Sequence, residues 1–244
     1  MTILDRFLAP KAADKEPPTV HVHGRAIPLT VKVSPRSKRL TMRVDAKSDS
    51  IVVVHPPGVR LREILAFARE KEGWLAARLA ALPDRIPFAV GATIPLLGIP
   101  NEITHVPTAR RGVWAEDGRL MVSGAPEHLA RRVRDYLIKR AKAEISPRAM
   151  DYAAKVDRRV TRISLRDPRS RWGSCTSDGA ISFSWRLILA PEAVLDYVVA
   201  HEVAHMVELN HSHHFWAVVR TIAGDTRDAR AWLKENGTRL HRYG

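Results

Sequence analysis

Cysteine is almost absent from this sequence, which has one among its 244 residues. The single thiol, Cys175, cannot close a disulfide within the chain, and this favours a reducing compartment such as the cytoplasm. Long apolar runs are lacking too, since none approaches the roughly 20 residues that span a bilayer. The opening stretch MTILDRFLAPKAADKEPP has no basic start followed by an apolar run, so it does not resemble a signal peptide. We therefore expect a cytoplasmic protein with no membrane partner.

Acidic side chains are scarce relative to basic ones. The sequence has 40 Lys and Arg against 26 Asp and Glu, a formal net charge of +14. Residues 129–171 concentrate this excess, with 14 basic and 5 acidic side chains. A basic surface attracts polyanions, so nucleic acid is a candidate partner. No nucleic-acid-binding motif accompanies the charge, however, and a solvated basic surface is the alternative explanation.

Local patterns in the first half predict a small, strand-rich region. Residues 1–20 are polar and proline-containing, which is typical of a flexible leader. Runs of β-branched residues within 27–54, separated by polar turns, predict a meander of antiparallel strands. Apolar residues at helical spacing then predict one helix over 61–82. Strand-like runs on both sides of Asp117-Gly118 predict a hairpin.

The second half alternates long helices with strands. A helical pattern runs from Pro126 to about Val156, and Ser146-Pro147 predicts a break or kink in it. Strands are predicted over 159–167 and 180–189, with a turn at Asp178-Gly179 between them. Pro191 then suits the first turn of another helix. Two shorter helices are predicted over 213–223 and 226–236.

The stretch AHEVAHMVELNHSHHFW, residues 200–216, gathers five histidines and two glutamates. His201 and His205 are four residues apart, so on a helix both rings project from one face and can bind one metal ion. Glu202 can then reach a metal-activated water without binding the metal itself. The flanking residues are apolar, and burying these polar groups without a partner would cost several kcal/mol. This pattern favours a catalytic zinc site over a polar helix.

Two residues compete for the role of third ligand. Glu208 lies two helical turns beyond His201 and can bind the metal if the helix continues, or can orient a ligand from outside. His211 lies ten residues beyond His201 and can bind if the chain turns back after the helix. Asn210 in the left-handed conformation would end the helix, and Ser212 would cap the next one. We prefer His211. The remaining pair, His213 and His214, is interpreted as surface or capping residues.

Several side chains before the motif have two interpretations. Arg169 and Arg171 can bind a substrate carboxylate or phosphate, or stabilise an oxyanion, but they can equally pair with Asp167 or Asp178. Tyr197, one turn ahead of His201, is a candidate transition-state donor or a packing residue. Trp172, Trp185 and Trp216 are interpreted as core residues, and so is Cys175, whose alternative role is that of a fourth, inhibitory metal ligand.

Residues 166–216 resemble the YgjP-like metallopeptidases, relatives of the SprT-like zinc proteases. The resemblance rests on Arg-Trp-Gly-Ser-Cys at 171–175, Trp185-Arg186-Leu187, Asp196-Tyr197-Val198-Val199, the metal helix, Asn210-His211-Ser212 and Phe215-Trp216. A weaker similarity extends to residues 39–44 and Trp74. It implies that His201, His205 and His211 bind zinc and that Glu202 is the general base.

We therefore predict an α+β fold, with a leader over 1–20, a strand-rich region over 21–124 and a zincin-like catalytic half over 125–244 that carries the H-E-x-x-H helix. The expected function is that of a zinc-dependent metallopeptidase that takes one Zn²⁺ per chain and acts on a protein or peptide substrate. One alternative is a metal-dependent phosphohydrolase of nucleoside triphosphates, although no glycine-rich phosphate loop or carboxylate cluster for magnesium is visible. Another is a nucleic-acid-associated adaptor with a structural metal. The oligomeric state is left open.

Overall fold

The computed structural model describes residues 17–244, a mixed α+β chain that forms two compact units divided between Leu82 and Pro83. Residues 1–16 of the predicted leader lie outside the described residues, and a strand already begins at Thr19. None of the helices among residues 17–244 is both long and apolar enough to cross a membrane.

The first unit combines a four-stranded sheet with two helices. Its elements are β1 (Thr19–Val22), β2 (Arg25–Val33), β3 (Thr41–Asp45), β4 (Ser50–His55), α1 (Leu61–Glu70) and α2 (Glu72–Ala80). The strand order is β1-β2-β4-β3. Buried Leu29 and Ile51 of the sheet pack in one core with Ile64 of α1 and Leu75 of α2.

Two predictions for this unit were wrong in detail. Strands β2 and β4 are parallel, with Leu29 opposite Ile51, and only β3 pairs antiparallel with β4, so residues 27–54 are not an antiparallel meander. The reason lies in the sequence of β4, SIVVVH, whose side chains are buried on both faces and suit a central position between two strands. The single helix predicted over 61–82 is two helices that meet at Lys71.

The second unit is built around one long helix. Its elements before that helix are β5 (Thr93–Leu96), β6 (Ile99–His105), β7 (Val113–Glu116), β8 (Arg119–Val122) and the 3₁₀ turn η1 (Pro126–His128). The rest are α3 (Leu129–Lys155), β9 (Arg162–Arg166), β10 (Gly173–Cys175), β11 (Ala180–Ser184), the 3₁₀ helix η2 (Trp185–Leu189), α4 (Glu192–Ala204), α5 (His213–Ala223) and α6 (Arg227–Leu240).

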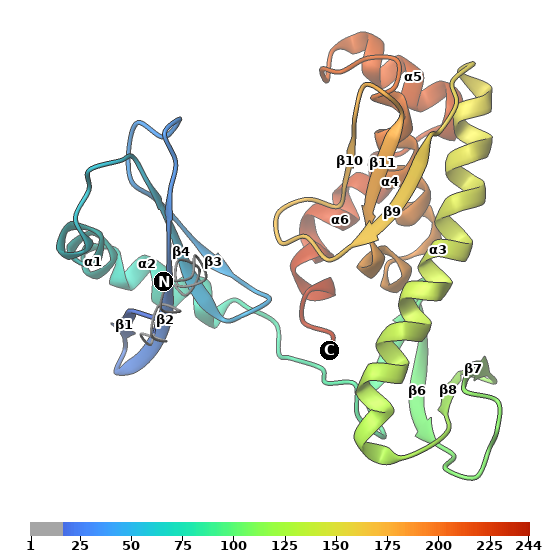
Figure 1. Cartoon of the computed structure of the whole chain (residues 1–244), viewed down its shortest axis with the longest axis horizontal. Helices are drawn as coiled ribbons and strands as arrows, with labels where there is room; N and C mark the ends of the chain where they lie inside the picture. The colour runs from blue at the N-terminus through green and yellow to red at the C-terminus, as the bar shows by residue number, and fades with distance from the viewer. Residues whose placement is uncertain (1–16) are drawn as a thin grey trace, which may run out of the picture. The chain divides into compact units, whose positions relative to one another are not determined.

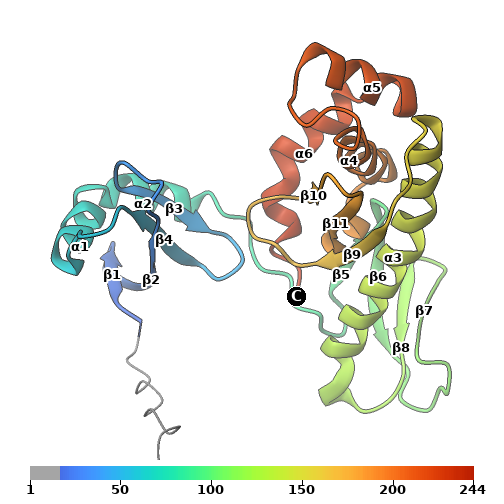
Figure 2. The ribbon, with the colours of Figure 1, turned by 45° about the horizontal axis from the view of Figure 1, so that its top comes forward.

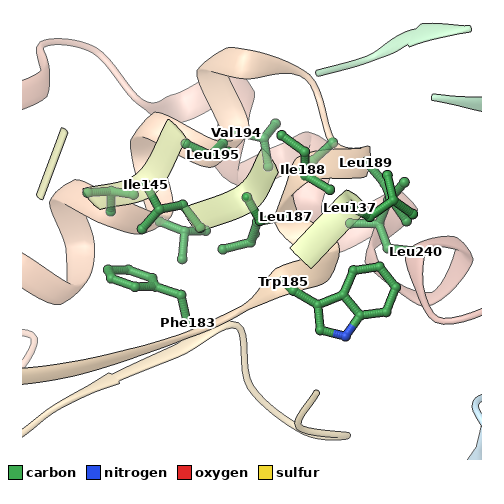
Figure 3. Close-up of a cluster of buried hydrophobic side chains, with 14 of the residues drawn as sticks. Leu137, Ile145, Phe183, Trp185, Leu187, Ile188, Leu189, Val194, Leu195 and Leu240 are labelled. Carbon is green, nitrogen blue, oxygen red and sulfur yellow. The ribbon is translucent and has the colours of Figure 1, made fainter. Parts of the chain in front are cut away.

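The two sheets of this unit lie along different parts of α3. Figures 1 and 2 both show β6–β8 beside the first half of α3, and β9–β11 with helices α4 and α5 beside its second half. The core joins both parts. Figure 3 shows Leu137 and Ile145 of α3 with Phe183 of β11, Trp185 of η2 and Leu195 of α4, all buried.

The strand order β5-β6-β8-β7 repeats that of the first unit, although the sequence contains no visible internal repeat. In both sheets the middle pair is parallel and the outer pairs are antiparallel. The first hairpins turn at His23-Gly24 and Leu97-Gly98, with positive φ at both residues of each turn. The hairpin predicted at Asp117-Gly118 is confirmed between β7 and β8.

Helix α3 continues through Pro147, where a break or kink was predicted. Proline removes one backbone N–H donor, but apolar residues on both sides of it, Ile145 and Ala149, are buried in the same core. Arg148 adds a link to α4, since its Nε lies 2.7 Å from Asp196 Oδ1 and a second nitrogen contacts Glu192. Packing on both sides of the proline therefore holds the helix in one piece.

The strand predicted over 180–189 ends at Ser184, and residues 185–189 form η2 instead. Asp178-Gly179 joins β11 to the short strand β10, which the sequence did not indicate, while β9 pairs with β11 in parallel. The two compact units divide between residues 82 and 83, and Ile103 and Leu120 of β6 and β8 share a core with α3. Domain bounds at 20 and 124 stay a prediction.

Candidate metal centre

The helix that carries the H-E-x-x-H pattern, α4, lies in the middle of the second unit's core. Its residues Leu195, Val199, Ala200 and Val203 are fully buried. Pro191 precedes the helix at its N-cap, and Glu192 places a negative charge in the first turn. His201 and His205 project from this buried helix and are partly exposed. The fold thus fixes the direction of both imidazoles through apolar packing.

The chain turns at the end of α4 and brings a third histidine to the first two. Helix α4 ends at Ala204, with His205 as its C-cap. His211 follows in the loop before α5, and the ligand atoms of His201, His205 and His211 lie within 4.8 Å of one another. The Nε2 atoms of His201 and His211 are 3.0 Å apart. Roughly 3.3 Å separates two nitrogens that bind one tetrahedral zinc at the usual distances.

The loop geometry differs in one detail from its prediction. Asn210 is not among the residues with positive φ, so it does not end the helix in the left-handed conformation. Instead its side-chain Oδ1 accepts a hydrogen bond from Ser212 N at 3.0 Å. Ser212 caps α5, as predicted, by accepting from Phe215 N at 3.4 Å. His211 therefore lies between the Asn210 hydrogen bond and the Ser212 cap.

Glu208 takes no part in the cluster of three imidazoles. Because α4 ends at Ala204, Glu208 is no longer on the helical face of His201. Its backbone oxygen lies 3.1 Å from His205 Nδ1. An Nδ1–H donated to this carbonyl leaves Nε2 of His205 free for a metal. The backbone carbonyl of Glu208 is thus placed to orient the His205 ring.

Phe215 packs against all three rings of the imidazole cluster. Its ring is fully buried, and its centre lies 4.9, 4.6 and 4.7 Å from the ring centres of His201, His205 and His211. Burial lowers the pKa of His201 to about 4, and the neighbouring charges of His205 and His211 act in the same direction. Burial also lowers the pKa of His205. His201 and His205 are therefore neutral at neutral pH, which is the form of imidazole that binds a metal ion.

Glu202 lies beside the cluster and is 6% exposed. Burial raises the pKa of its carboxyl to about 7, while the positive charge of Arg171 acts in the opposite direction. Gly173 of β10 borders this carboxylate. A carboxyl whose pKa lies near neutrality can both accept and return a proton.

A cleft of about 410 Å³ opens over these groups. Residues 171–175 line one side of it, and Tyr197, His201 and Glu202 line another. The Tyr197 hydroxyl lies 3.5 Å from Nδ1 of His201. Of the predicted substrate-binding residues, Arg171 and Tyr197 therefore border the cleft, whereas Arg169 does not line it.

The sequence also offered Asp167 and Asp178 as ion-pair partners of Arg169 and Arg171. Asp167 pairs with the buried Arg186, whose Nε lies 2.8 Å from Asp167 Oδ1. Trp185 is in the core, as predicted, and Trp172 packs against the same core while it also lines the cleft. Cys175 lines the cleft too, and its thiol donates to Thr176 O at 3.4 Å.

One residue near the site was missed by sequence reasoning. Arg230 of α6 lies with its guanidinium carbon 3.9 Å from the ring centre of Trp216, which itself packs against His201. It also borders Tyr197, whose pKa is raised by burial and lowered in part by this guanidinium. A spacing of 29 residues from His201 gave no local signal that Arg230 approaches the metal cluster.

Comparisons with known proteins agree with the chemistry of this cluster. A search of curated proteins finds no match. A solved structure that is similar to the chain is the crystal structure of the metallopeptidase zymogen of Pyrococcus abyssi abylysin. The identity is 20%, the TM-score is 0.31, and the alignment covers 45% of this chain and 96% of that one, which is too weak to support an inference. The model of the YgjP-like metallopeptidase domain matches residues 38–236, so the chain belongs to the YgjP-like metallopeptidase family.

Proposed function

We propose that this metallopeptidase is a zinc enzyme in which His201, His205 and His211 bind the metal and Glu202 is the general base. The observation that carries the proposal is the approach of three imidazoles to within 4.8 Å beside a buried glutamate. The family membership implies a metal cofactor and a protein or peptide substrate. We also assign the half of the chain that contains α4 to the zincin-like peptidases.

The donor set supports zinc as the metal. Three neutral imidazoles without a carboxylate are typical of a catalytic zinc site, in which a fourth position stays open. The cluster borders an open cleft and has a buried aromatic ring on its other side. Zinc, when bound there, would acidify a water molecule and polarise the carbonyl of the scissile bond.

Glu202 would move the protons of the reaction. Its carboxylate accepts a proton from the attacking water and then passes it to the leaving amine, so that it ends the cycle ionised. A pKa of about 7 suits both steps, because neither the acid nor the base form is strongly favoured at neutral pH. Gly173 leaves the space that this side chain needs.

Two further side chains would act on the substrate carbonyl. Tyr197 can donate its hydroxyl hydrogen to the oxyanion that forms on attack, since it lies next to His201 at the edge of the cleft. Arg171 borders the same cleft and can hold a substrate carboxylate or stabilise the oxyanion. Arg169, the third predicted residue, would act only from outside the cleft lining.

The test compares the full chain with its Glu202→Gln variant. Both proteins are purified, their metal content is measured by mass spectrometry, and hydrolysis of casein is followed with and without a chelator. We expect about one zinc per chain in both proteins, chelator-sensitive hydrolysis in the wild type, and a loss of turnover on the order of 10³-fold in the variant.

Side-by-side release assays on nucleoside triphosphates separate peptidase from phosphohydrolase activity. Full activity of Glu202→Gln on casein would remove the assigned role of the glutamate. Zinc-free wild-type protein, even after zinc is offered, would remove the metal site itself. Phosphate release without peptide hydrolysis would favour the phosphohydrolase alternative.

A further inference from the structure

A second groove adjoins the metal cleft along helix α6. It has a volume of about 540 Å³ and is lined by Trp172, Tyr197, Arg227, Arg230, Leu233 and Lys234, together with Ala231. Trp172, Tyr197 and Leu233 also line the metal cleft. The α6 groove and the metal cleft are therefore neighbours that share part of their lining, and Tyr197 borders both of them.

Basic side chains of α6 form one face of the α6 groove. Residues 227, 230 and 234 follow one another at intervals of three and four, which places them in one row along the helix. The row spans about 10 Å, because a helix rises roughly 1.5 Å per residue. No carboxylate is among the described residues that line the groove.

The net charge of this row comes from two of its three members. Arg227 is paired with Asp225, with 2.6 Å between Nη2 and Oδ2. Arg230 and Lys234 form no ion pair among residues 17–244 and are exposed. Trp216 lies against the face of the Arg230 guanidinium, so this group is held in place while its edge can bind a planar anion. The groove thus offers a fixed guanidinium and a mobile ammonium group to a ligand.

We propose that the α6 groove is a specificity subsite that binds a carboxylate of the peptide substrate. The proposal rests on the proposed peptidase function. An extended peptide advances about 3.3 Å per residue, so the row of about 10 Å corresponds to roughly three substrate residues beyond the scissile bond. The carboxylate belongs either to an acidic side chain in these positions or to a C-terminus that ends there.

Direct binding tests the subsite without any need for turnover. The full chain with Glu202→Gln is titrated against fluorescein-labelled decapeptides of one sequence that contain two Glu or two Gln, all amidated at the C-terminus. A third peptide has the two Gln and a free C-terminal carboxylate. We expect the Glu peptide, the free-acid peptide or both to bind about tenfold more tightly than the amidated Gln peptide, as a charged pair at a partly enclosed site allows.

Matched variants separate the groove from the general positive charge of the chain. Lys234→Glu in the Glu202→Gln background should remove the preference for the carboxylate, and Arg230→Gln should weaken it. Lys139→Glu makes the same charge change on α3, at a residue that lines neither the α6 groove nor the metal cleft, and should leave the preference unchanged.

Each outcome bears on the subsite. Equal binding of all three peptides, no measurable binding, or an equal loss of preference in Lys139→Glu and Lys234→Glu would overturn it. A carboxylate preference that disappears only with the α6 variants supports it, even if wild-type protein cleaves no peptide, in which case the proposed function alone fails. Where wild-type protein does cleave the Glu peptide, the cut should fall within about three residues of a Glu.

Discussion

Gly173 lies directly against the carboxylate of Glu202. A Cβ atom on residue 173 would come within 2.4 Å of Glu202 Cγ and within 2.6 Å of both Cδ and Oε1. Non-bonded carbon atoms do not approach so closely, so any other residue at this position must displace the glutamate side chain. Gly173 of the short strand β10 therefore limits the positions that the side chain of Glu202, the proposed general base, can adopt.

Gly173→Ala should strongly reduce activity while the protein stays folded. The atoms in the way belong to the end of a flexible side chain, so Glu202 can move aside at little cost in stability, but its carboxylate leaves the cleft. We expect a fall in kcat on the order of 10²-fold, with metal content and Tm nearly unchanged. Gly73→Ala in α2 is the matched control, because nothing lies within 4 Å of an added Cβ there. Undiminished kcat in Gly173→Ala would show that the position of Glu202 is not critical.

His211→Ala should reduce zinc affinity by at least about 100-fold, since it removes one of the three proposed ligands and leaves only His201 and His205. Glu208→Gln should have little effect, because its contact with His205 is made by the backbone carbonyl. The measurement is competition with a fluorescent zinc chelator, followed by metal mass spectrometry. The reverse result, loss of zinc in Glu208→Gln alone, would make Glu208 the third ligand.

Arg186→Met should destabilise the protein strongly. Arg186 is 3% exposed, and its guanidinium pairs with Asp167 and donates to Leu240 O at 2.9 Å and Tyr243 O at 2.7 Å. Its removal leaves a carboxylate and two carbonyls without their donor, which costs about 3 kcal/mol of unfolding free energy. Arg134→Ala is the control, since its exposed side chain reaches Asp167 only at 4.0 Å and contributes under about 1 kcal/mol. Urea titration measures both values, and a similar loss in the two variants would contradict the assignment.

Cys175 should react slowly with alkylating reagents in the folded, metal-free protein. Burial raises the pKa of its thiol from 9.0 to about 11, and the charges of Glu202 and Asp178 add to the rise. The thiolate fraction at pH 8 is then roughly 100-fold lower than in the unfolded chain, and it increases with pH until about 11. The stability that the neutral thiol supplies is complete below pH 9 and is lost between pH 9 and 11.

Iodoacetamide labelling in the presence of a chelator, with and without urea, measures the ratio of the two alkylation rates. The sequence has only one cysteine, so the label reports this thiol alone. Equal rates in folded and unfolded protein would show that Cys175 is neither buried nor perturbed.

Local signals predicted the elements that depend on few residues. The Asp117-Gly118 turn and the Ser212 cap act within four residues of chain, and both occur where the sequence placed them. Helix α5 has the predicted bounds of 213 and 223. The apolar run at 185–189 predicts a strand but forms a 3₁₀ helix, because a short apolar segment has no periodicity that separates a strand from a buried turn.

Contacts between distant segments were beyond such patterns. Strands β2 and β4, and likewise β9 and β11, pair in parallel. Parallel strands are not joined by a hairpin turn, so no turn sequence between them specifies the pairing. Gly173 lies against Glu202, which is 29 positions away in the sequence. Arg230 interacts with Tyr197, which is 33 positions away. The three histidines were proposed as metal ligands from their spacing and from the family resemblance, and their roles stay proposals.

Because α4 is buried, the folding of this unit should not depend on a bound metal ion. Leu195, Val199 and Val203 anchor this helix in apolar contacts that involve no histidine, so two of the three imidazoles keep their direction whether or not an ion lies between them. Many small zinc domains collapse when they are stripped of metal, because the ion is their core. Here the ion would enter a scaffold that is already rigid. Loss of an ion from the proposed site would therefore remove activity without unfolding the chain.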